Sequence, residues 1–241
     1  MIRSCVCVSA SALVSISGSA WAGITIVNPG LYTNLSEVGQ ARIRLDQGNS
    51  QTWKAAFWKD LSMLANSGVQ GPSPAVWSNA AEYDWTIKYN AASGNGSIQV
   101  SANQNVVTAA NFGLSAGKSL AGFYFFVNST YAGGSDINGA HAKTEVYGMS
   151  LKIDGGLPVA IPGLTADFLQ SFVQGPNYYF DSAATDVEFS GKIKYTWNAG
   201  ANLNNERNKF TLKLLEGERI PTPGATALLA LGGLALARRR R

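Results

Sequence analysis

Apolar and polar residues alternate along several stretches of this chain with a period of two residues. In Asp186–Asn198 the apolar side holds Val187, Phe189, Ile193, Tyr195 and Trp197, and the other side is polar or charged. This period is typical of a β-strand with one buried face. Phe210, Leu212 and Leu214 alternate in the same way, so we expect these two segments to pair as an antiparallel hairpin.

Other segments predict further strands. Glu82–Tyr89 alternates, the turn-forming run NAASGNG follows, and Ser97–Ser101 alternates again, which predicts a second hairpin. The apolar run Leu120–Val127 indicates a strand buried on both faces. The remaining candidate strands are Tyr147–Ile153, Ile24–Val27, Thr52–Trp58, Val106–Thr108 and Asn177–Phe180.

Helix is scarce in this pattern. Leu164–Phe172 is the best short candidate, and Leu61–Asn66 fits a single turn. Many short strands with Gly and Asn turns favour an all-β fold, an antiparallel two-sheet β-sandwich of the jelly-roll kind. We expect one such domain over residues 23–219.

The first 22 residues have the three parts of a signal peptide. Arg3 lies in a short basic start, an apolar stretch runs from Val6 to Ile16, and Ala20-Trp21-Ala22 is an A-x-A cleavage pattern. Signal peptidase is expected to cut after Ala22 and leave Gly23 as the first residue. An N-terminal strand through this stretch is the alternative.

The last 22 residues, 220–241, have a different tripartite pattern. Pro221, Thr222, Pro223 and Gly224 break regular structure, and Ala225–Ala237 is an apolar run of 13 residues. Four basic residues close the chain: Arg238, Arg239, Arg240 and Arg241. A bilayer core needs about 20 apolar residues, so a helix here would be a short transmembrane segment with its basic end on the cytoplasmic side.

This tail resembles the C-terminal sorting signal of bacterial PEP-CTERM proteins, with Pro-Thr-Pro-Gly in place of the usual Pro-Glu-Pro motif. The resemblance implies an exosortase-like processing enzyme as a partner and transient membrane association through the C-terminal segment. It also implies final delivery to the cell surface or to a matrix of extracellular polysaccharide. The missing Glu separates this chain from the usual motif.

The body has a second resemblance. The order of Trp53 to Trp58, Tyr83-Asp84-Trp85, the YNAASGNGSIQV segment, LKIDG and FSGKIKYTW is similar to "choice-of-anchor" extracellular domains. Those domains occur attached to different anchoring tails and have no firmly assigned activity. The resemblance therefore supports the fold and the anchored setting more than any chemistry.

The two terminal segments also account for the basic charge. The formal net charge is +4, but Arg3 and the four terminal arginines supply five of the 19 basic residues. Residues 23–219 keep 14 basic residues against 15 acidic ones, a net charge of −1, so nucleic acid is not an expected partner. Cys5 and Cys7 lie in the leader, which leaves the domain without disulfide or thiolate chemistry.

Catalytic patterns are not apparent in the sequence. His141 is the single histidine, in a polar glycine-rich loop, and such a residue is usually only solvated. A glycoside hydrolase needs two facing carboxyl groups. The candidates Glu82, Asp84, Glu145 and Glu188 lie on polar strand faces with nothing to pair them. We expect a protein that is not an enzyme.

No cofactor is expected, and calcium is the alternative that stays open. Asp136-Ile137-Asn138-Gly139 offers two oxygen ligands and a glycine but lacks the distant Glu of an EF-hand loop. Asp181, Asp186 and Glu188 are further acidic candidates, although Asp186 and Glu188 fit a solvated strand face as well.

Tryptophans are the remaining candidates for binding, because a sugar ring stacks on an exposed indole. Trp85 and Trp197 lie on apolar strand faces and are expected in the core. Trp58 and Trp77 are the better candidates for exposure and sugar contact, although core packing of all five domain tryptophans is the favoured interpretation. The sequence thus predicts an exported structural or adhesive protein of the cell surface, and a carbohydrate-binding module that retains matrix polysaccharide is the second interpretation.

Overall fold

The computed structural model describes residues 24–26, 31–45, 55–58, 69–70, 77–101, 106–110, 112–129, 141–167, 170–199, 201 and 208–220. The expected leader, residues 221–241 of the sorting segment, the turn at Leu61–Asn66 and the loop Asp136–Gly139 lie outside these residues. Within them the chain forms 15 strands and no helix, and therefore no helix that could span a membrane. The all-β fold class is confirmed.

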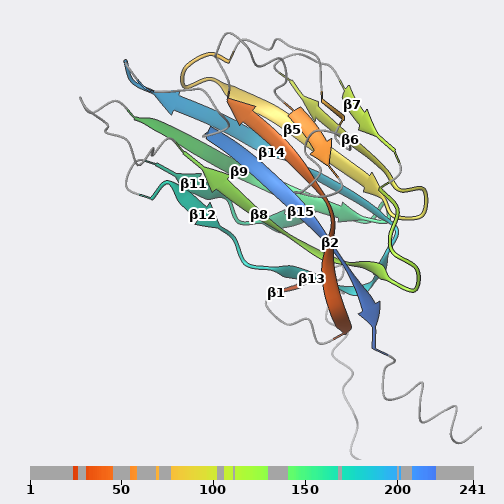
Figure 1. The fold of residues 1–241 in the computed structure, drawn as a ribbon. Helices are drawn as coiled ribbons and strands as arrows, with labels where there is room; N and C mark the ends of the chain where they lie inside the picture. The colour runs from red at the N-terminus through yellow and green to blue at the C-terminus, as the bar shows by residue number, and fades with distance from the viewer. Residues whose placement is uncertain are drawn as a thin grey trace, which may run out of the picture.

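The strands form two antiparallel sheets that pack face to face (Figure 1). In spatial order, sheet 1 contains β1 (Ile24–Ile26), β13 (Tyr178–Ala184), β8 (Ser119–Asn128), β15 (Asn208–Arg219), β2 (Tyr32–Leu45), β3 (Ala55–Trp58) and β4 (Val69–Gln70), and β12 (Phe172–Gln174) also pairs with β8. Sheet 2 contains β10 (Val159–Ile161), β9 (Ala142–Ile153), β14 (Asp186–Trp197), β5 (Glu82–Asn90), β6 (Asn95–Val100) and β7 (Val106–Ala109), and β11 (Leu164–Ala166) also pairs with β9.

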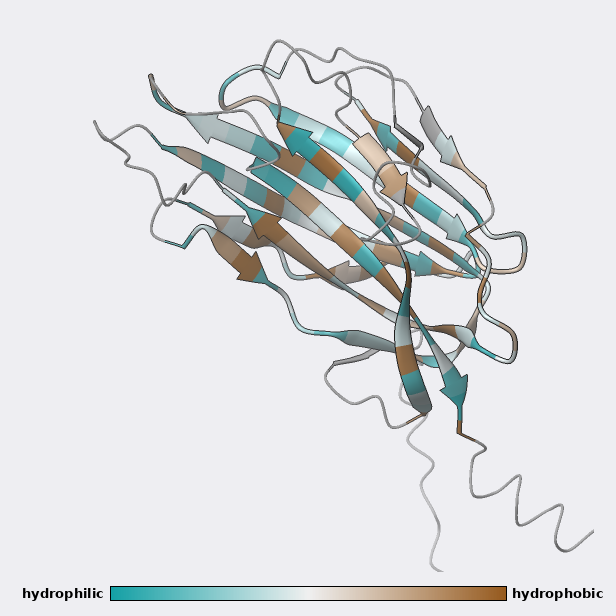
Figure 2. Ribbon diagram, in the orientation of Figure 1, coloured by the Kyte–Doolittle hydropathy of each residue, from teal (hydrophilic) through white to brown (hydrophobic). Residues whose placement is uncertain are grey.

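The core lies between the sheets and is built from the apolar side of each alternating strand. Apolar and polar bands alternate along strands such as β14 and β15 (Figure 2). Phe123 on β8 links the layers, because its ring packs edge-on against Phe189 of β14 at 4.8 Å and stacks on Tyr178 at 4.8 Å. Aromatic pairs at such spacings add to the stabilisation that area burial provides.

Gly191 on β14 illustrates how tightly this core is packed. A Cβ atom at this position would lie 2.8 Å from the Trp85 ring and 3.0 Å from Met149. The glycine therefore makes room for the indole of Trp85, which is buried as the alternation predicts. The expected hairpin of residues 82–89 and 97–101 is confirmed as β5 and β6.

Two local predictions are wrong. The expected helix at Leu164–Phe172 is replaced by β11 and the start of β12, which pair with β9 and β8 in different sheets. Likewise β14 and β15 are not a hairpin, because β14 pairs with β5 and β9 whereas β15 pairs with β2 and β8. Consecutive strands repeatedly change sheet in this fold.

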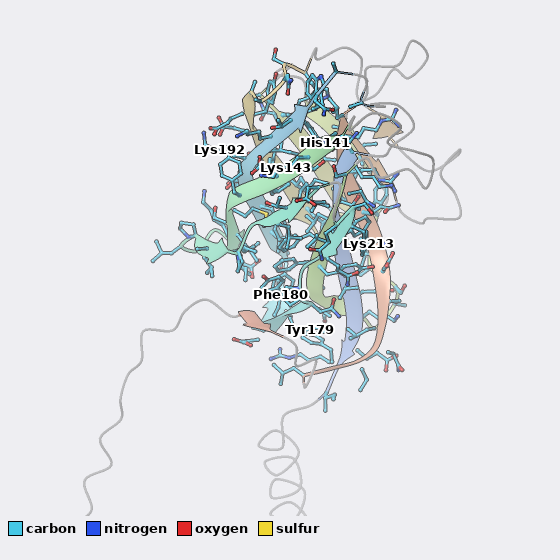
Figure 3. The ribbon with its side chains drawn as sticks, turned by 90° about the vertical axis from the view of Figure 1, so that its left-hand side faces the viewer. His141, Lys143, Tyr179, Phe180, Lys192 and Lys213 are labelled. Atoms are coloured by element: carbon cyan, nitrogen blue, oxygen red, sulfur yellow. The ribbon has the colours of Figure 1, made fainter. Side chains whose placement is uncertain are left out.

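The strand directions give the sandwich two distinct ends. At one end the Ser129 hydroxyl donates to the Ala142 carbonyl, and Ala142 is paired with Trp197. Leu45 and Asn208 are paired there too, and His141 lies at this end in Figure 3, with Tyr179 and Phe180 toward the other. At the opposite end the Ile220 amide donates to the Leu31 carbonyl at 2.8 Å. We call these the His141 end and the Ile220 end.

Candidate functional site

Of the two tryptophans proposed for sugar contact, the structure describes the side chain of Trp77 alone. Trp77 is 1% exposed, because its ring packs edge-on between Tyr83 at 4.8 Å and Tyr195 at 5.0 Å. The burial of Trp77 contradicts its candidacy for sugar contact and agrees with the core-packing interpretation. Trp58 lies in β3 opposite Gln40, and its side chain is outside the described residues. Trp197 is partly buried and packs against the edge of the core.

The candidate catalytic carboxylates all lie on the outer face of sheet 2, where lysines surround them. Lys192 lies 3.5 Å from Glu82 and 3.7 Å from Asp84, and Lys143 lies 2.7 Å from Glu145. The pKa of Glu82 is lowered, first by the hydroxyl of Tyr147 and then by Lys192. Such ion pairs favour ionised carboxylates, whereas a general acid needs a raised pKa.

Among the calcium candidates, Asp181 and Asp186 are exposed and Glu188 is held by lysines. The described residues contain no cluster of three potential ligands, and the loop at Asp136–Gly139 lies outside them. Asp186 instead accepts a hydrogen bond from the Asn90 side chain at 2.5 Å. Asp186 and Glu188 thus lie at the surface of sheet 2, whereas Asp181 lies on β13 of sheet 1.

A polar groove crosses the outer face of sheet 2, with a volume of about 750 Å³. One row of paired residues crosses it, in the order Lys152, Glu188, Lys88, Ser97 and Thr108. Glu188 lies 2.9 Å from the Lys88 ammonium and 3.1 Å from that of Lys152. Hydrogen bonds from Lys88 and then Lys152 lower the pKa of Glu188 against the opposing effect of partial burial. The groove is thus lined by charges that already neutralise one another.

A second, smaller pocket of about 290 Å³ lies at the His141 end. We call it the His141 pocket; its lining is His141, Lys143, Asp167, Thr196, Trp197 and Asn198. It brings together residues that carry an ammonium, a carboxylate, an amide and an imidazole. Trp197 contributes to the lining from the end of β14, and its side chain packs against the core.

Backbone contacts hold the walls of this pocket. The Asn79 side chain accepts from the Trp197 amide at 2.9 Å and donates to the Trp197 carbonyl at 2.6 Å. The Asn198 side chain accepts from the His141 amide at 2.6 Å, and its nitrogen lies 3.2 Å from the ring Nδ1 of His141. The Gln170 amide donates to the Asp167 carboxylate at 2.9 Å. The pocket is therefore formed on fixed strand ends.

Sequence reasoning found His141 but not its neighbours. The pocket joins the start of β9, the residue after β11 and the end of β14, segments separated by tens of residues. Two pairings bring them together: β9 with β14, which sets Lys143 opposite Thr196, and β9 with β11, which Asp167 follows. The feature of the sequence that pointed to this pocket was that Trp197 and Asn198 are adjacent at the end of a predicted strand.

A third polar cluster lies toward the Ile220 end, around Glu216 of β15. Glu216 is 4% exposed and accepts hydrogen bonds from the Ser115 amide at 2.7 Å and hydroxyl at 2.6 Å. The Ser36 hydroxyl donates to it at 3.0 Å, and the Lys118 ammonium lies 3.3 Å away. Burial alone would raise the pKa of Glu216, but these donors offset burial and the net pKa is lowered.

Comparison with known proteins adds no relative to this picture. The chain matches no protein-family model, and no curated protein matches it significantly.

Proposed function

We propose that this chain is an exported protein of the cell surface or extracellular matrix, with a structural or adhesive role. A signal peptide ending at Ala22 directs export, and residues 220–241 hold the protein at the membrane until an exosortase-like enzyme cuts the tail. In this proposal the domain of residues 23–219 has no catalytic role and needs no cofactor. Its two sheets and frequent sheet changes support a jelly-roll-like sandwich.

The arrangement of the two ends is the observation that supports this role best. Strand β15 ends at Arg219, and Ile220, the residue before the proposed sorting motif, is held by the Leu31 carbonyl. Strand β15 runs from Asn208 at the His141 end to Arg219 at the Ile220 end. Its 12 residues span roughly 40 Å at about 3.4 Å each. A domain tethered at Ile220 would therefore present its His141 end away from the membrane.

The sorting signal can be tested in the native host. Replacing Pro221–Gly224 with alanines, or deleting Arg238–Arg241, should leave uncleaved or mislocalised precursor, measured by size and fractionation. The first change removes the proposed recognition motif, and the second removes the basic residues that stop translocation. A matched control replaces the exposed pair Glu218 and Arg219, which precede the motif, and should mature normally. Normal maturation of both tail variants would overturn the proposal.

A further inference from the structure

We propose that two phenylalanine rings on the outer face of sheet 1, those of Phe126 and Phe172, bind one unit of a neutral polysaccharide. We call these two rings the Phe172 platform. The inference rests on the proposed function, since it names what an anchored domain would hold. It places the sugar contact on an exposed ring in place of the buried Trp77.

Strand alternation turns both rings outward. Phe126 alternates with core residues along β8, and Phe172 on β12 is paired with Asn128 of the same strand. The next residue, Val173, packs against the core instead. Phe172 is 48% exposed, more than any other aromatic side chain that the structure describes, and β12 shows this as a hydrophobic band (Figure 2). The two ring centroids lie 5.3 Å apart, so the rings form one surface.

Uncharged polar groups surround the platform. Gln174 is exposed and paired with Phe126, so its amide lies on the same face as the rings. The segment 170–177, which contains β12, carries no charged residue, and one lysine, Lys209, is paired with Asn128 on the other side of β8. The C–H face of a pyranose packs on an aromatic ring, and its hydroxyls need amide donors and acceptors nearby. A polyanion would need an excess of positive charge, so the surroundings favour a neutral sugar.

The exposed apolar area is small for a protein partner. A phenylalanine side chain has an accessible area of roughly 200 Å². An exposure of 48% therefore leaves about 100 Å² on Phe172, whereas a stable dimer buries about 800 Å² on each partner. Tyr124, the preceding outer residue of β8, does not extend the platform, because the Lys213 ammonium lies 5.5 Å from its ring centroid and its hydroxyl donates to Glu37. The platform thus suits a single sugar ring better than a second copy of this chain.

The platform lies toward the His141 end of the sandwich. The Ser129 amide donates to the Ser171 carbonyl at 2.8 Å, directly before Phe172. A domain tethered at Ile220 would therefore present these rings away from the membrane. The groove on sheet 2 is the competing location, but the aromatic residue in its lining, Tyr89, is 1% exposed and offers no ring to a sugar.

Substitutions at Phe172 can separate ring stacking from general apolar contact. Phe172→Tyr keeps the ring, whereas Phe172→Leu keeps an apolar side chain without it. Gln174→Ala removes the neighbouring amide. Leu157→Ala is the matched control, because Leu157 is 84% exposed between β9 and β10 of sheet 2. The full-length chain and these four variants would be titrated by calorimetry with neutral hexasaccharides of glucose, mannose, galactose and N-acetylglucosamine, and with an oligogalacturonate as the anionic probe.

We expect saturable binding of at least one neutral probe. Phe172→Leu should weaken it about fivefold or more through loss of the stacked ring, and Gln174→Ala about threefold through loss of a hydrogen bond. Phe172→Tyr and Leu157→Ala should leave the affinity within about twofold. All four variants should keep the melting temperature within a few degrees, because the changed side chains are exposed.

Several results would overturn the inference. They are no saturation by any neutral probe up to about 10 mM, tighter binding of the anionic probe, and affinity that Phe172→Leu or Gln174→Ala leaves unchanged. Equal loss in Phe172→Tyr or in Leu157→Ala would overturn it as well. Sedimentation of the unsubstituted chain at about 100 μM tests the other occupant, since a dimer that Phe172→Leu dissociates would assign the platform to self-association. Each failure is separate from failure of the sorting proposal, which is read out by maturation and fractionation alone.

Discussion

Glu216 and Glu188 are two carboxylates whose pKa is lowered by lysines and neighbouring donors, in two very different environments. Glu216 is 4% exposed and lies among the amide of Ser115 and two serine hydroxyls. The side chain of Glu188 is 30% exposed and lies between two lysine ammonium groups on the outer face of sheet 2.

Two carboxylates whose pKa shifts in the same direction can therefore contribute very different amounts to the free energy of unfolding. For Glu216 the donors come from residues 101 and 180 positions away, so one carboxylate joins β15, β2 and the segment before β8. Water cannot replace these donors when the group is lost, because the site is buried. Around Glu188, water and salt compete with each ion pair, so the pairs contribute little.

The largest effect is expected from Glu216→Ala. It leaves the Ser115 amide, two hydroxyls and the Lys118 ammonium without their shared acceptor, and the Lys118 side chain is only 18% exposed. We expect a loss of about 2–4 kcal/mol in the free energy of unfolding, measured by urea denaturation at pH 7. Glu218→Ala, two residues further along in an exposed position, is the control and should cost under about 0.5 kcal/mol. A loss below about 1 kcal/mol for Glu216→Ala would show that the buried surroundings of Glu216 stabilise the fold no more than the exposed surroundings of Glu188.

The pH dependence of stability should report the contribution of Glu216. The pKa of Glu216 is lowered from its ordinary value of 4.5, so its contribution is fully present above that pH. The contribution is then lost as the pH falls through the lowered folded value, because the unfolded state binds the proton first. The difference in unfolding free energy between the wild type and Glu216→Gln should be constant above about pH 5 and shrink toward pH 3. A difference that stays constant down to pH 3 would contradict this account.

The sequence predicts strands well where one face meets water. Along β5 and β14 the outer residues are charged and the inner ones apolar, so the alternation locates both strands within a residue or two of their ends. The continuous apolar run of β8 is buried on both faces only over Leu120–Phe123, beyond which Tyr124 and Phe126 are half-buried. The pattern and the burial therefore agree along β5 and β14, and for β8 they agree only over Leu120–Phe123.

The alternation of apolar and polar residues does not predict burial or pairing that depends on segments distant in the sequence. Strand β2 was not predicted, although Ala41, Ile43 and Leu45 alternate with Gln40, Arg42 and Arg44 there; the burial of these three polar side chains is not indicated by local composition. Leu164, Phe168 and Phe172 have helical spacing, but Leu164 pairs with Val146 of β9 and Phe172 with Asn128 of β8. Alternation also identifies a strand without naming its partner, which is why β14 and β15 were expected to pair. The His141 pocket depends on the same non-local pairing.

The smallest effect is expected from Glu188→Ala, which completes the comparison. Removing this carboxylate leaves Lys88 and Lys152 with side chains 59% and 44% exposed, and water can solvate both. We expect a loss of about 0.5 kcal/mol or less at low ionic strength, measured by urea denaturation at pH 7. In about 1 M salt, where the screening length is roughly 3 Å, this loss should vanish. The penalty for Glu216→Ala should persist in the same salt, because ions do not reach buried donors. If salt removed the penalty at Glu216 as well, its hydrogen bonds would have to be as open to solvent as the ion pairs of Glu188, and the stability assigned to that cluster would not hold.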